Sequence, residues 1–429
     1  MFSRRTLLKL SATTAAAFGL RLPTADAAEG PQSSLPPSIA ALTSMRDQAK
    51  PITVEERRAR IEKARELMAA NHLDAILLMG GTSMSYFTNI RWSGGERTFA
   101  IVLPAKGKPF CVCPAFEAAR AHEQLELGPM GKDADVMTWQ EDESPYRLVA
   151  QGLKDRGISS GSLGIEERTA FVFADGVAHA APTVKVVSAT PVTAGCRMIK
   201  TQHELDLMTT ANQATLKVYE AVYKALKPGM TQNDASDLID AAYRRVGFRG
   251  GASVQVGEFS ALPHGSITPQ VIKEGEIIMV DDGCTVEGYQ SDITRTFVLG
   301  KASDKMKRNF DIVHRAQAAA LAAAKPGAQC QSVDAAARQV IADAGYGPDY
   351  KYFLHRLGHG IGMDGHEWPY LVRGNNLPLQ ANMCFSDEPG IYVRGEFGVR
   401  LEDDMHITED GAKLFTPQSP SLEDPFGAA

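Results

Sequence analysis

The chain has 429 residues, 44% of them apolar and 22% charged, which is typical of a globular protein with roughly two or three domains. The net charge is −6 and there is no basic stripe, so nothing indicates a nucleic acid as partner. No apolar run beyond the first 27 residues is long enough to cross a membrane, and we therefore expect no membrane span.

The first 27 residues have the features of an export signal. Ser3-Arg4-Arg5-Thr6-Leu7-Leu8-Lys9 resembles a twin-arginine motif, a mildly apolar stretch follows, and Ala25-Asp26-Ala27 matches a cleavage site. An ordinary secretory signal and a tail with two arginines are the alternatives. We expect residues 1–27 to be a twin-arginine signal peptide, read by the twin-arginine export machinery, and the mature protein to be periplasmic or secreted. This route carries folded proteins that often already hold a cofactor, which favours a metal.

The next part of the chain predicts a linker and a small α/β domain. Residues 28–50 are rich in Pro, Ser, Gln and Ala and are expected to be a linker. Thr53-x-x-Glu56 is a capping box, which predicts a helix to about Ala70. Two apolar runs are expected to be strands, residues 74–80 and 98–104. Strands and helices then alternate to about residue 190.

One motif in this part is misleading. Gly157-Ile158-Ser159-Ser160-Gly161 fits the G-x-S-x-G pattern of serine hydrolases. That nucleophile turn needs a strand before it and a helix after it, whereas here a helix comes first and a strand follows. We therefore expect a loop without catalytic function.

The six cysteines fit no zinc-binding spacing. They are Cys111, Cys113, Cys196, Cys284, Cys330 and Cys384. An oxidising compartment would allow disulfides, but we expect most of the six to be free, buried thiols.

The second half of the chain contains an internal repeat. Lys227-Pro228-Gly229 and Lys325-Pro326-Gly327 lie 98 residues apart. A long helical pattern precedes each turn, a second helix follows it, and a Gly-aromatic pair ends it, Gly247-Phe248 and Gly345-Tyr346. This match indicates a duplication. Two similar halves would pack about a pseudo-twofold axis, and a site at their interface would draw residues from both.

Three aspartates lie in the stretch MVDDGCTVEGYQSDITRT. Residues 276–281 and 290–299 are predicted to form an antiparallel hairpin, in which Asp281 and Asp292 face each other. Two such carboxylates repel, and a pair of divalent cations would remove the repulsion. Side chains alternate along a strand, so Asp282 points away from this face and is not expected to be a ligand.

Further candidate ligands follow downstream, in a stretch from His355 to His366, in Ser386-Asp387-Glu388-Pro389-Gly390, and in residues 399–404. Carboxylates with one imidazole form an oxygen-rich set that suits Mn²⁺, Fe²⁺, Co²⁺ or Zn²⁺. Each piece alone is a weak signal, because a single histidine or a loop carboxylate is more often structural or solvated.

Taken together, these motifs resemble the pita-bread metallopeptidase family, which includes Xaa-Pro aminopeptidase, prolidase and methionine aminopeptidase. The stretches that carry the resemblance are Asp281-x-Gly283, Gly288-Tyr289-x-Ser291-Asp292-x-Thr294-Arg295-Thr296, Gly358-His359-Gly360-Ile361-Gly362, Glu388-Pro389-Gly390 and Arg400-x-Glu402-Asp403. The resemblance implies an α/β (α+β) chain with a creatinase-like N-terminal domain over residues 51–195. A pseudo-twofold pita-bread catalytic domain would follow over residues 196–429. Methionine aminopeptidases lack the N-terminal domain, which argues against that branch.

The resemblance also implies a dinuclear site with two divalent ions, for which we expect Mn²⁺ ahead of Co²⁺, Zn²⁺ or Fe²⁺. Asp281 would bind one ion, Asp292 and Glu402 would bridge the two, and His359 and Glu388 would bind the second. A water between the ions would become hydroxide and attack the scissile carbonyl, with Glu388 moving its proton. Creatinase shares the fold without these ligands.

Five further residues match family positions near the substrate. His264 and His366 are implied to act in catalysis and substrate binding, with His366 hydrogen-bonded to the carbonyl or the developing oxyanion. His355, Tyr392 and Arg400 are implied to line the pocket for the residue after the cleaved bond. Packing or support of the ligands is the alternative for all five.

The implied substrate is a peptide with proline after the cleaved bond. That bond has no N–H, so it must be recognised by the shape of the pocket. Gly365 stands where relatives often carry an apolar side chain, which predicts a wider pocket and a looser preference for proline.

The resemblance implies a homodimer or higher homo-oligomer. In dimeric relatives a residue near Trp92 reaches the neighbouring active site, and an ordinary core tryptophan is the alternative here. Two other functions stay open: a hydrolase or lyase of the same fold that acts on a small non-peptide compound, and a binding protein that has lost catalysis. The complete ligand set argues against the latter. The motifs do not distinguish a dipeptidase from an aminopeptidase.

Overall fold

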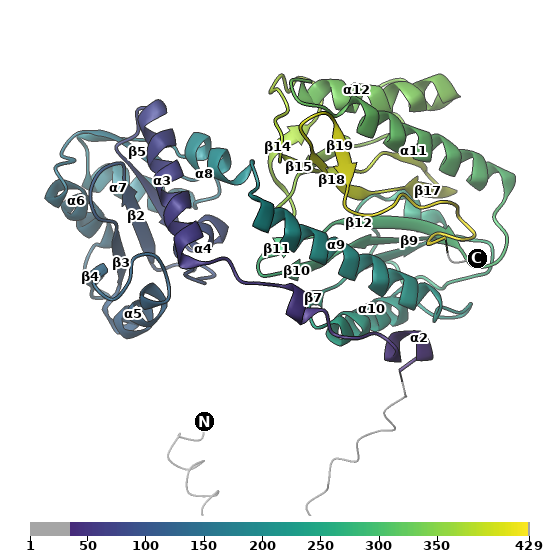
Figure 1. Ribbon diagram of the computed structural model, residues 1–429, viewed down its shortest axis with the longest axis horizontal. Coiled ribbons are helices and arrows are strands. Elements are labelled where there is room, and N and C mark those ends of the chain that lie inside the picture. Colours follow the sequence, from purple (N-terminus) through teal and green to yellow (C-terminus); the bar gives the residue numbers. More distant parts are fainter. Residues whose placement is uncertain (1–34, 428–429) are drawn as a thin grey trace, which may run out of the picture. The chain divides into compact units, whose positions relative to one another are not determined.

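The computed structural model describes residues 35–427 (Figure 1). The signal peptide expected over residues 1–27 and the first part of the expected linker lie outside this range. Within it, no helix combines the length and the apolar character that crossing a bilayer requires.

The N-terminal domain contains a six-stranded mixed sheet in the order β4-β3-β2-β1-β5-β6. Its strands are β1 (Ala75–Met79), β2 (Ala100–Pro104), β3 (Phe110–Pro114), β4 (Asp135–Trp139), β5 (Gly161–Ile165) and β6 (Val184–Ser188). The central β1 runs antiparallel to β2 and parallel to β5. Alternate side chains of β1 enter two separate cores, Ile76 on one face and Leu77 on the other. The two strands expected from the sequence are confirmed as β1 and β2.

Helices cover both faces of this sheet (Figure 1). One core contains side chains of α3 (Val54–Ala70), α4 (Thr82–Thr88), α5 (Ala118–Glu126) and α8 (Thr190–Arg197), and the other contains those of α6 (Pro145–Asp155) and α7 (Phe171–Ala180). The predicted capping box is present, because Thr53 accepts the N–H of Glu56 while the Glu56 carboxylate accepts the N–H of Thr53. The G-x-S-x-G stretch is the loop between α6 and β5, as expected.

The second domain repeats a pair of helices. The pairs are α9 (Gln202–Tyr223) with α10 (Gln232–Val246) and α11 (Asp304–Ala323) with α12 (Cys330–Ile341), and the members of each pair lie side by side (Figure 1). Equivalent turn glycines make equivalent hydrogen bonds. Gly229 N–H donates to the Ile272 carbonyl at 2.8 Å, and Gly327 N–H donates to the Leu379 carbonyl at 2.9 Å. The duplication predicted from the sequence is therefore visible in the backbone.

Each helix pair packs on its own sheet and core. The first sheet has the order β12-β9-β8, from β8 (Ser253–Val256), β9 (Ile277–Asp282) and β12 (Ile293–Val298). The second has the order β14-β13-β15-β18-β19, from β13 (Gly358–Gly360), β14 (Glu367–Leu371), β15 (Cys384–Asp387), β18 (Asp403–Ile407) and β19 (Ala412–Leu414). Three short strands, β7 (Arg249–Gly250), β10 (Cys284–Val286) and β11 (Tyr289–Gln290), form a third sheet, and β16 (Gly390–Val393) with β17 (Phe397–Arg400) forms a hairpin.

The predicted hairpin of β9 and β12 is present, but its register differs from the expectation. Asp281 pairs with Thr294, and Asp282 pairs with Ile293. Asp292 precedes β12, because the chain between β9 and β12 forms the additional strands β10 and β11. The expectation that Asp281 and Asp292 face each other directly was therefore wrong. Asp292 is two residues from the partner of Asp281, so both side chains stay on one face.

Part of the segment expected to be a linker packs on the second domain. Its short helix α2 (Pro37–Ala40) carries Ile39, which is fully buried in the core of α9 and α10. The Ser38 hydroxyl donates to the Ala221 carbonyl at 2.7 Å, and the Met45 N–H donates to the Val246 carbonyl at 2.9 Å. This part of the expected linker therefore belongs to the fold of the second domain. All six cysteines are free and buried, as expected for most of them.

Candidate metal centre

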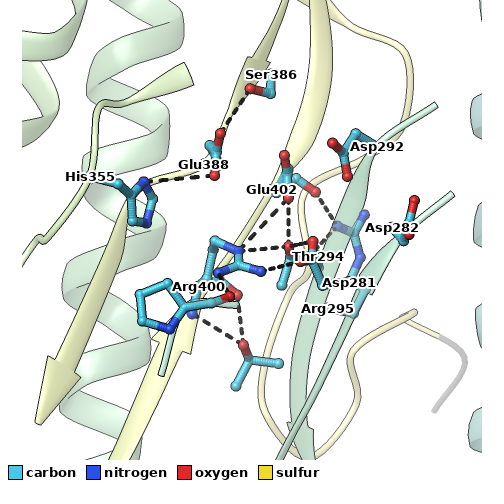
Figure 2. Close-up of polar contacts among 12 residues, drawn as sticks. Asp281, Asp282, Asp292, Thr294, Arg295, His355, Ser386, Glu388, Arg400 and Glu402 are labelled. Carbon is cyan, nitrogen blue, oxygen red and sulfur yellow. Dashed lines mark hydrogen bonds and ion pairs between the residues drawn. The ribbon is translucent and has the colours of Figure 1, made fainter. Parts of the chain in front are cut away.

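The five residues expected to bind metal come from both halves of the second domain and line one cavity of about 380 Å³. Asp281 lies near the end of β9, Asp292 just before β12, His359 in β13, Glu388 directly after β15, and Glu402 between β17 and β18. Each is at or near a strand end, where two sheets meet. Figure 2 shows the four carboxylates among them together with the residues that hold them.

Ligand atoms of these residues come close enough to share ions. Three groups each have their ligand atoms within 4.8 Å of one another: Asp281, Asp292 and Glu402; His359, Glu388 and Glu402; and Asp292, His359 and His366. Asp292, His359 and Glu402 each belong to two groups. Asp292 and Glu402 are also the two residues that the resemblance assigns as bridges, and the overlap of the groups fits a site for two neighbouring ions.

The electrostatics of the cavity also fit bound cations. Burial, with the nearby charges of Asp281 and Asp404, raises the pKa of Asp292 well above its usual range. Burial and the charge of Asp292 do the same to the pKa of Glu402, and burial raises the pKa of Glu388 to about 7. So many buried carboxylates cannot all be ionised without positive charge among them, and divalent ions would supply it.

His359 is in the protonation state that a metal ligand needs. Burial, and next the nearby His366, lowers the pKa of His359 to about 3, so the imidazole is neutral. Its Nε2 lies 3.3 Å from Glu388 Oε1 and 3.7 Å from Asp292 Oδ2. Its other ring nitrogen, Nδ1, lies 3.2 Å from the carbonyl of Gly360 and can donate to it. That bond leaves Nε2 free to face the cavity with a lone pair.

Thr294 and Arg400 fix the carboxylates on one side of the centre (Figure 2). The Thr294 hydroxyl lies 2.6 Å from Asp281 Oδ1 and 2.5 Å from Glu402 Oε2, so it can donate its proton to either. Arg400 Nε donates to that hydroxyl at 2.9 Å, and Arg400 Nη2 forms an ion pair with Asp281. This arrangement gives Thr294 a definite role, whereas the sequence suggested only a supporting one.

Two residues within the candidate stretches, Asp404 and Ser386, position ligands, a role that the sequence did not indicate. Asp404 Oδ2 accepts the backbone N–H of Asp292 at 2.9 Å and so holds that residue in place. The Ser386 hydroxyl accepts the backbone N–H of His359 at 3.1 Å and donates to Glu388 Oε1 at 3.2 Å. Each residue lies two positions from an expected ligand, and that proximity was the only signal that the sequence offered.

Three of the expected substrate residues form a hydrogen-bonded row, in which His355 and Arg400 line the cavity while Tyr392 is buried and is not part of the lining. His355 Nε2 lies 2.7 Å from the Tyr392 hydroxyl, and Arg400 Nη1 donates to the same hydroxyl at 3.1 Å. Burial lowers the pKa of His355 to about 3 and raises the pKa of Tyr392 to about 12, so both side chains are neutral near pH 7. The row is therefore a fixed wall with one positive charge.

The other two, His264 and His366, are exposed and line the open side of the cavity. The rings of His366 and His359 are stacked, with centroids 3.6 Å apart. Arg356 Nη2 lies 3.2 Å from His366 Nδ1. A guanidinium cannot accept a hydrogen bond, so His366 Nδ1 must accept and its proton is on Nε2. In that tautomer His366 Nε2 can donate a hydrogen bond but has no lone pair free to bind a metal.

The third aspartate of the stretch, Asp282, belongs to none of the three ligand groups. Its Oδ1 accepts the N–H of Gly283 at 2.9 Å, and its backbone carbonyl accepts the Tyr219 hydroxyl at 2.9 Å. These contacts fit the expectation that Asp282 is not a ligand. Trp92 is partly buried in the N-terminal domain. Its ring stacks on that of Phe99, with the ring centroids 3.9 Å apart, and the guanidinium of Arg120 lies over the Trp92 ring.

Comparison with known proteins identifies the family. Residues 206–409 match the sequence model of Metallopeptidase family M24, and residues 60–199 match that of the Creatinase/Prolidase N-terminal domain. The chain is 33% identical over 373 residues to the Xaa-Pro dipeptidase of Lactobacillus delbrueckii subsp. lactis, covering 85% of this chain and 98% of that protein. The chain belongs to metallopeptidase family M24. The expected fold, with a creatinase-type domain followed by a pita-bread domain, is confirmed.

Solved structures agree with this assignment. Dipeptidase PepE from Mycobacterium ulcerans superimposes with a TM-score of 0.81 at 34% identity, covering 87% of this chain and 99% of that one. Xaa-Pro dipeptidase from Bacillus anthracis superimposes with a TM-score of 0.74 at 28% identity, covering 86% of this chain and 99% of that one. The chain is accordingly a metallopeptidase, which confirms the class of enzyme expected from its motifs.

Proposed function

We propose that this metallopeptidase hydrolyses the peptide bond before proline in Xaa-Pro substrates and uses two divalent metal ions. The observation that carries the proposal is the convergence of Asp281, Asp292, His359, Glu388 and Glu402 on one cavity, in overlapping groups. The names of the relatives, Xaa-Pro dipeptidase among them, support the substrate. An oxygen-rich set with one imidazole suits Mn²⁺ well.

The chain would divide the ions between its two halves. Asp281 would hold one ion, His359 and Glu388 the other, and Asp292 and Glu402 would lie between them. When bound, the ions would supply Lewis acidity, which polarises the scissile carbonyl and acidifies a water. Thr294 and Arg400 keep Asp281 and Glu402 in place, so the ligands are positioned before the ions arrive.

Glu388 is the residue best placed to move a proton. Its Oε1 accepts from Ser386 at 3.2 Å and its Oε2 lies 3.8 Å from His355 Nδ1, so both oxygens face defined neighbours. A carboxylate at the edge of the centre can take a proton from the attacking water and deliver it to the departing proline nitrogen. His366, with its proton on Nε2, would donate to the substrate carbonyl, and His264 lines the same opening.

The pocket wall fits a substrate that must be recognised by shape. A bond before proline has no N–H to donate, so van der Waals contact must replace a hydrogen bond. His355 and Arg400, which the buried Tyr392 joins through hydrogen bonds, would provide a rigid surface for the ring. A Cβ at Gly365, beside His366, would meet only Gln290 Oε1 within 4 Å, at 3.4 Å, so there is space next to this residue that a side chain would fill. This space supports a tolerant preference for proline.

A panel of four substrates tests the function. We expect the Mn²⁺-loaded protein to cleave Ala-Pro and Met-Pro, and to cleave Ala-Ala with a kcat/KM at least about tenfold lower. Ala-Ala lacks the proline ring, and the loss of such contacts in a pocket lowers transition-state binding by about 1–3 kcal/mol. Ala-Pro-Ala shows whether a longer chain is accepted. Release of free amino acids is measured by chromatography. No cleavage of any of the three proline peptides with Mn²⁺, Co²⁺ or Zn²⁺ would refute the proposal and favour a small non-peptide substrate.

We further propose that the enzyme is exported through the twin-arginine route. The supporting observation is the motif at Ser3–Lys9 followed by the site at Ala25–Ala27. When the full chain is expressed in a bacterial host, the exported protein should begin at Ala28 by mass spectrometry. Replacing Arg4 and Arg5 together by lysine should leave the chain uncleaved in the cytoplasm. Equal export of the double variant would show that this route is not used.

A further inference from the structure

Arg356 carries the one side-chain cation of the cavity that no acidic residue pairs with. The lining contains two arginines, Arg356 and Arg400. Among residues 35–427, no carboxylate oxygen lies within ion-pair distance of Arg356. We propose that Arg356 binds the free carboxylate of the substrate and thereby makes the enzyme a dipeptidase. This inference rests on the proposed function and specifies its substrate.

Arg400 cannot take this role, because its donors are already used. Its Nε donates to Thr294 at 2.9 Å, its Nη1 donates to the Pro263 carbonyl and the Tyr392 hydroxyl, both at 3.1 Å, and its Nη2 pairs with Asp281. It is also buried, so it supports the wall of the cavity. Within residues 35–427 the guanidinium of Arg356 makes one hydrogen bond, to His366 Nδ1, and most of its donors remain available.

The guanidinium of Arg356 is held in place before substrate binds. It lies over the ring of Tyr370, with Cζ 4.1 Å from the ring centroid, while Nη2 donates to His366. Stacking on one face and one edge contact fix the plane of the group. A fixed guanidinium with free N–H groups is suited to a planar carboxylate, which it binds through two parallel hydrogen bonds.

Arg356 also lies beside the residue that is expected to hold the substrate carbonyl. In Xaa-Pro the free carboxylate is three bonds beyond the scissile carbonyl carbon, a span of at most about 4.3 Å. His366, which is expected to donate to that carbonyl, is the residue that Arg356 contacts. A substrate that extends beyond proline places a neutral amide there instead, so the arginine would lose its charged partner.

The test compares a free acid with its amide. The wild-type protein is assayed on Ala-Pro and on Ala-Pro-amide, which differ only in the charge of the terminal group, and on Ala-Pro-Ala. We expect kcat/KM for the acid to exceed that for the amide by on the order of 10- to 100-fold, the effect of one charged hydrogen bond. Most of this difference should come from a higher KM for the amide, which lacks the negative charge. In Arg356→Gln the acid-to-amide ratio should fall to about 1. Arg356→Lys should restore part of it.

The matched control is Arg373→Gln, an exposed arginine that also lies over a tyrosine ring but is outside the cavity. Its acid-to-amide ratio should equal that of the wild type. If Arg356→Gln lowers kcat/KM for the acid and for the amide by the same factor, the acid-to-amide ratio stays high. That result would assign Arg356 a structural role only and would overturn the inference. So would a wild-type ratio near 1, a result that needs no variant. If the wild type cleaves none of the three substrates, it is the proposed function that fails.

Discussion

The variant Asp292→Asn is expected to lose both its metal and its activity. Asparagine keeps the size of the side chain but removes the negative charge that two ions would share. A metal centre supplies several kcal/mol of transition-state stabilisation, so kcat/KM on Ala-Pro should fall by about 10³-fold or more. Bound metal is counted by mass spectrometry of the acid-digested protein, and activity by amino-acid release.

The chain offers a matched control in the same stretch. Asp282 lies ten residues earlier in the sequence and belongs to no ligand group. Its backbone has a positive φ of 133°, which asparagine tolerates better than most residues. Asp282→Asn should keep the metal content and stay within about threefold of wild-type activity, as expected for a change away from the chemistry. If Asp292→Asn retained as much metal as the wild type, the site assignment would be wrong.

The second large effect concerns stability and comes from Arg295, which follows Thr294 in β12. Its side chain is 1% exposed and forms an ion pair of 2.6 Å with Asp403, which is fully buried. Arg295 Nη1 also donates to the carbonyl of Glu402, at 2.9 Å. Arg295→Met would leave the Asp403 carboxylate buried without its cation, so the free energy of unfolding should fall by about 3–5 kcal/mol. Denaturant titration followed by circular dichroism measures this change.

Two further variants separate burial from charge. Arg373 forms an exposed ion pair with Asp349, and Arg373→Met should change the free energy of unfolding by less than about 1 kcal/mol. The double variant Arg295→Met with Asp403→Leu removes both charges, so it should recover much of the stability lost in the single variant. A single variant as stable as the wild type would show that the pair does not stabilise the fold.

The local features of the fold were predictable because each depends on neighbours in the sequence. The capping box at Thr53 needs only residues three positions apart, and the repeated Lys-Pro-Gly turns need only their own glycines. The five ligands were predictable for another reason. Each belongs to a short motif that resembles those of one family, so their convergence did not have to be derived from packing.

Features that depend on residues far apart in sequence were not predictable in this way. The register of β9 and β12 depends on how the intervening chain folds, and that chain forms strands β10 and β11. Ile39 looks like part of a linker until the core of α9 and α10 is assembled around it. Likewise, the ion pair of Arg400 with Asp281 joins residues 119 positions apart. This pair distinguishes Arg400 from Arg356, the other arginine of the cavity, which has no acidic partner among residues 35–427.

If two metal ions held by these five residues carry out the hydrolysis, as we propose, activity must follow the amount of bound metal, and a metal titration measures both. The protein is stripped with a chelator, dialysed, and titrated with Mn²⁺ while Ala-Pro hydrolysis and bound metal are measured on the same samples. We expect no turnover without metal and a rise to a plateau at about two ions per chain, the stoichiometry of a two-metal site. Full turnover by the metal-free protein, or two bound ions without any turnover of Ala-Pro, would contradict it.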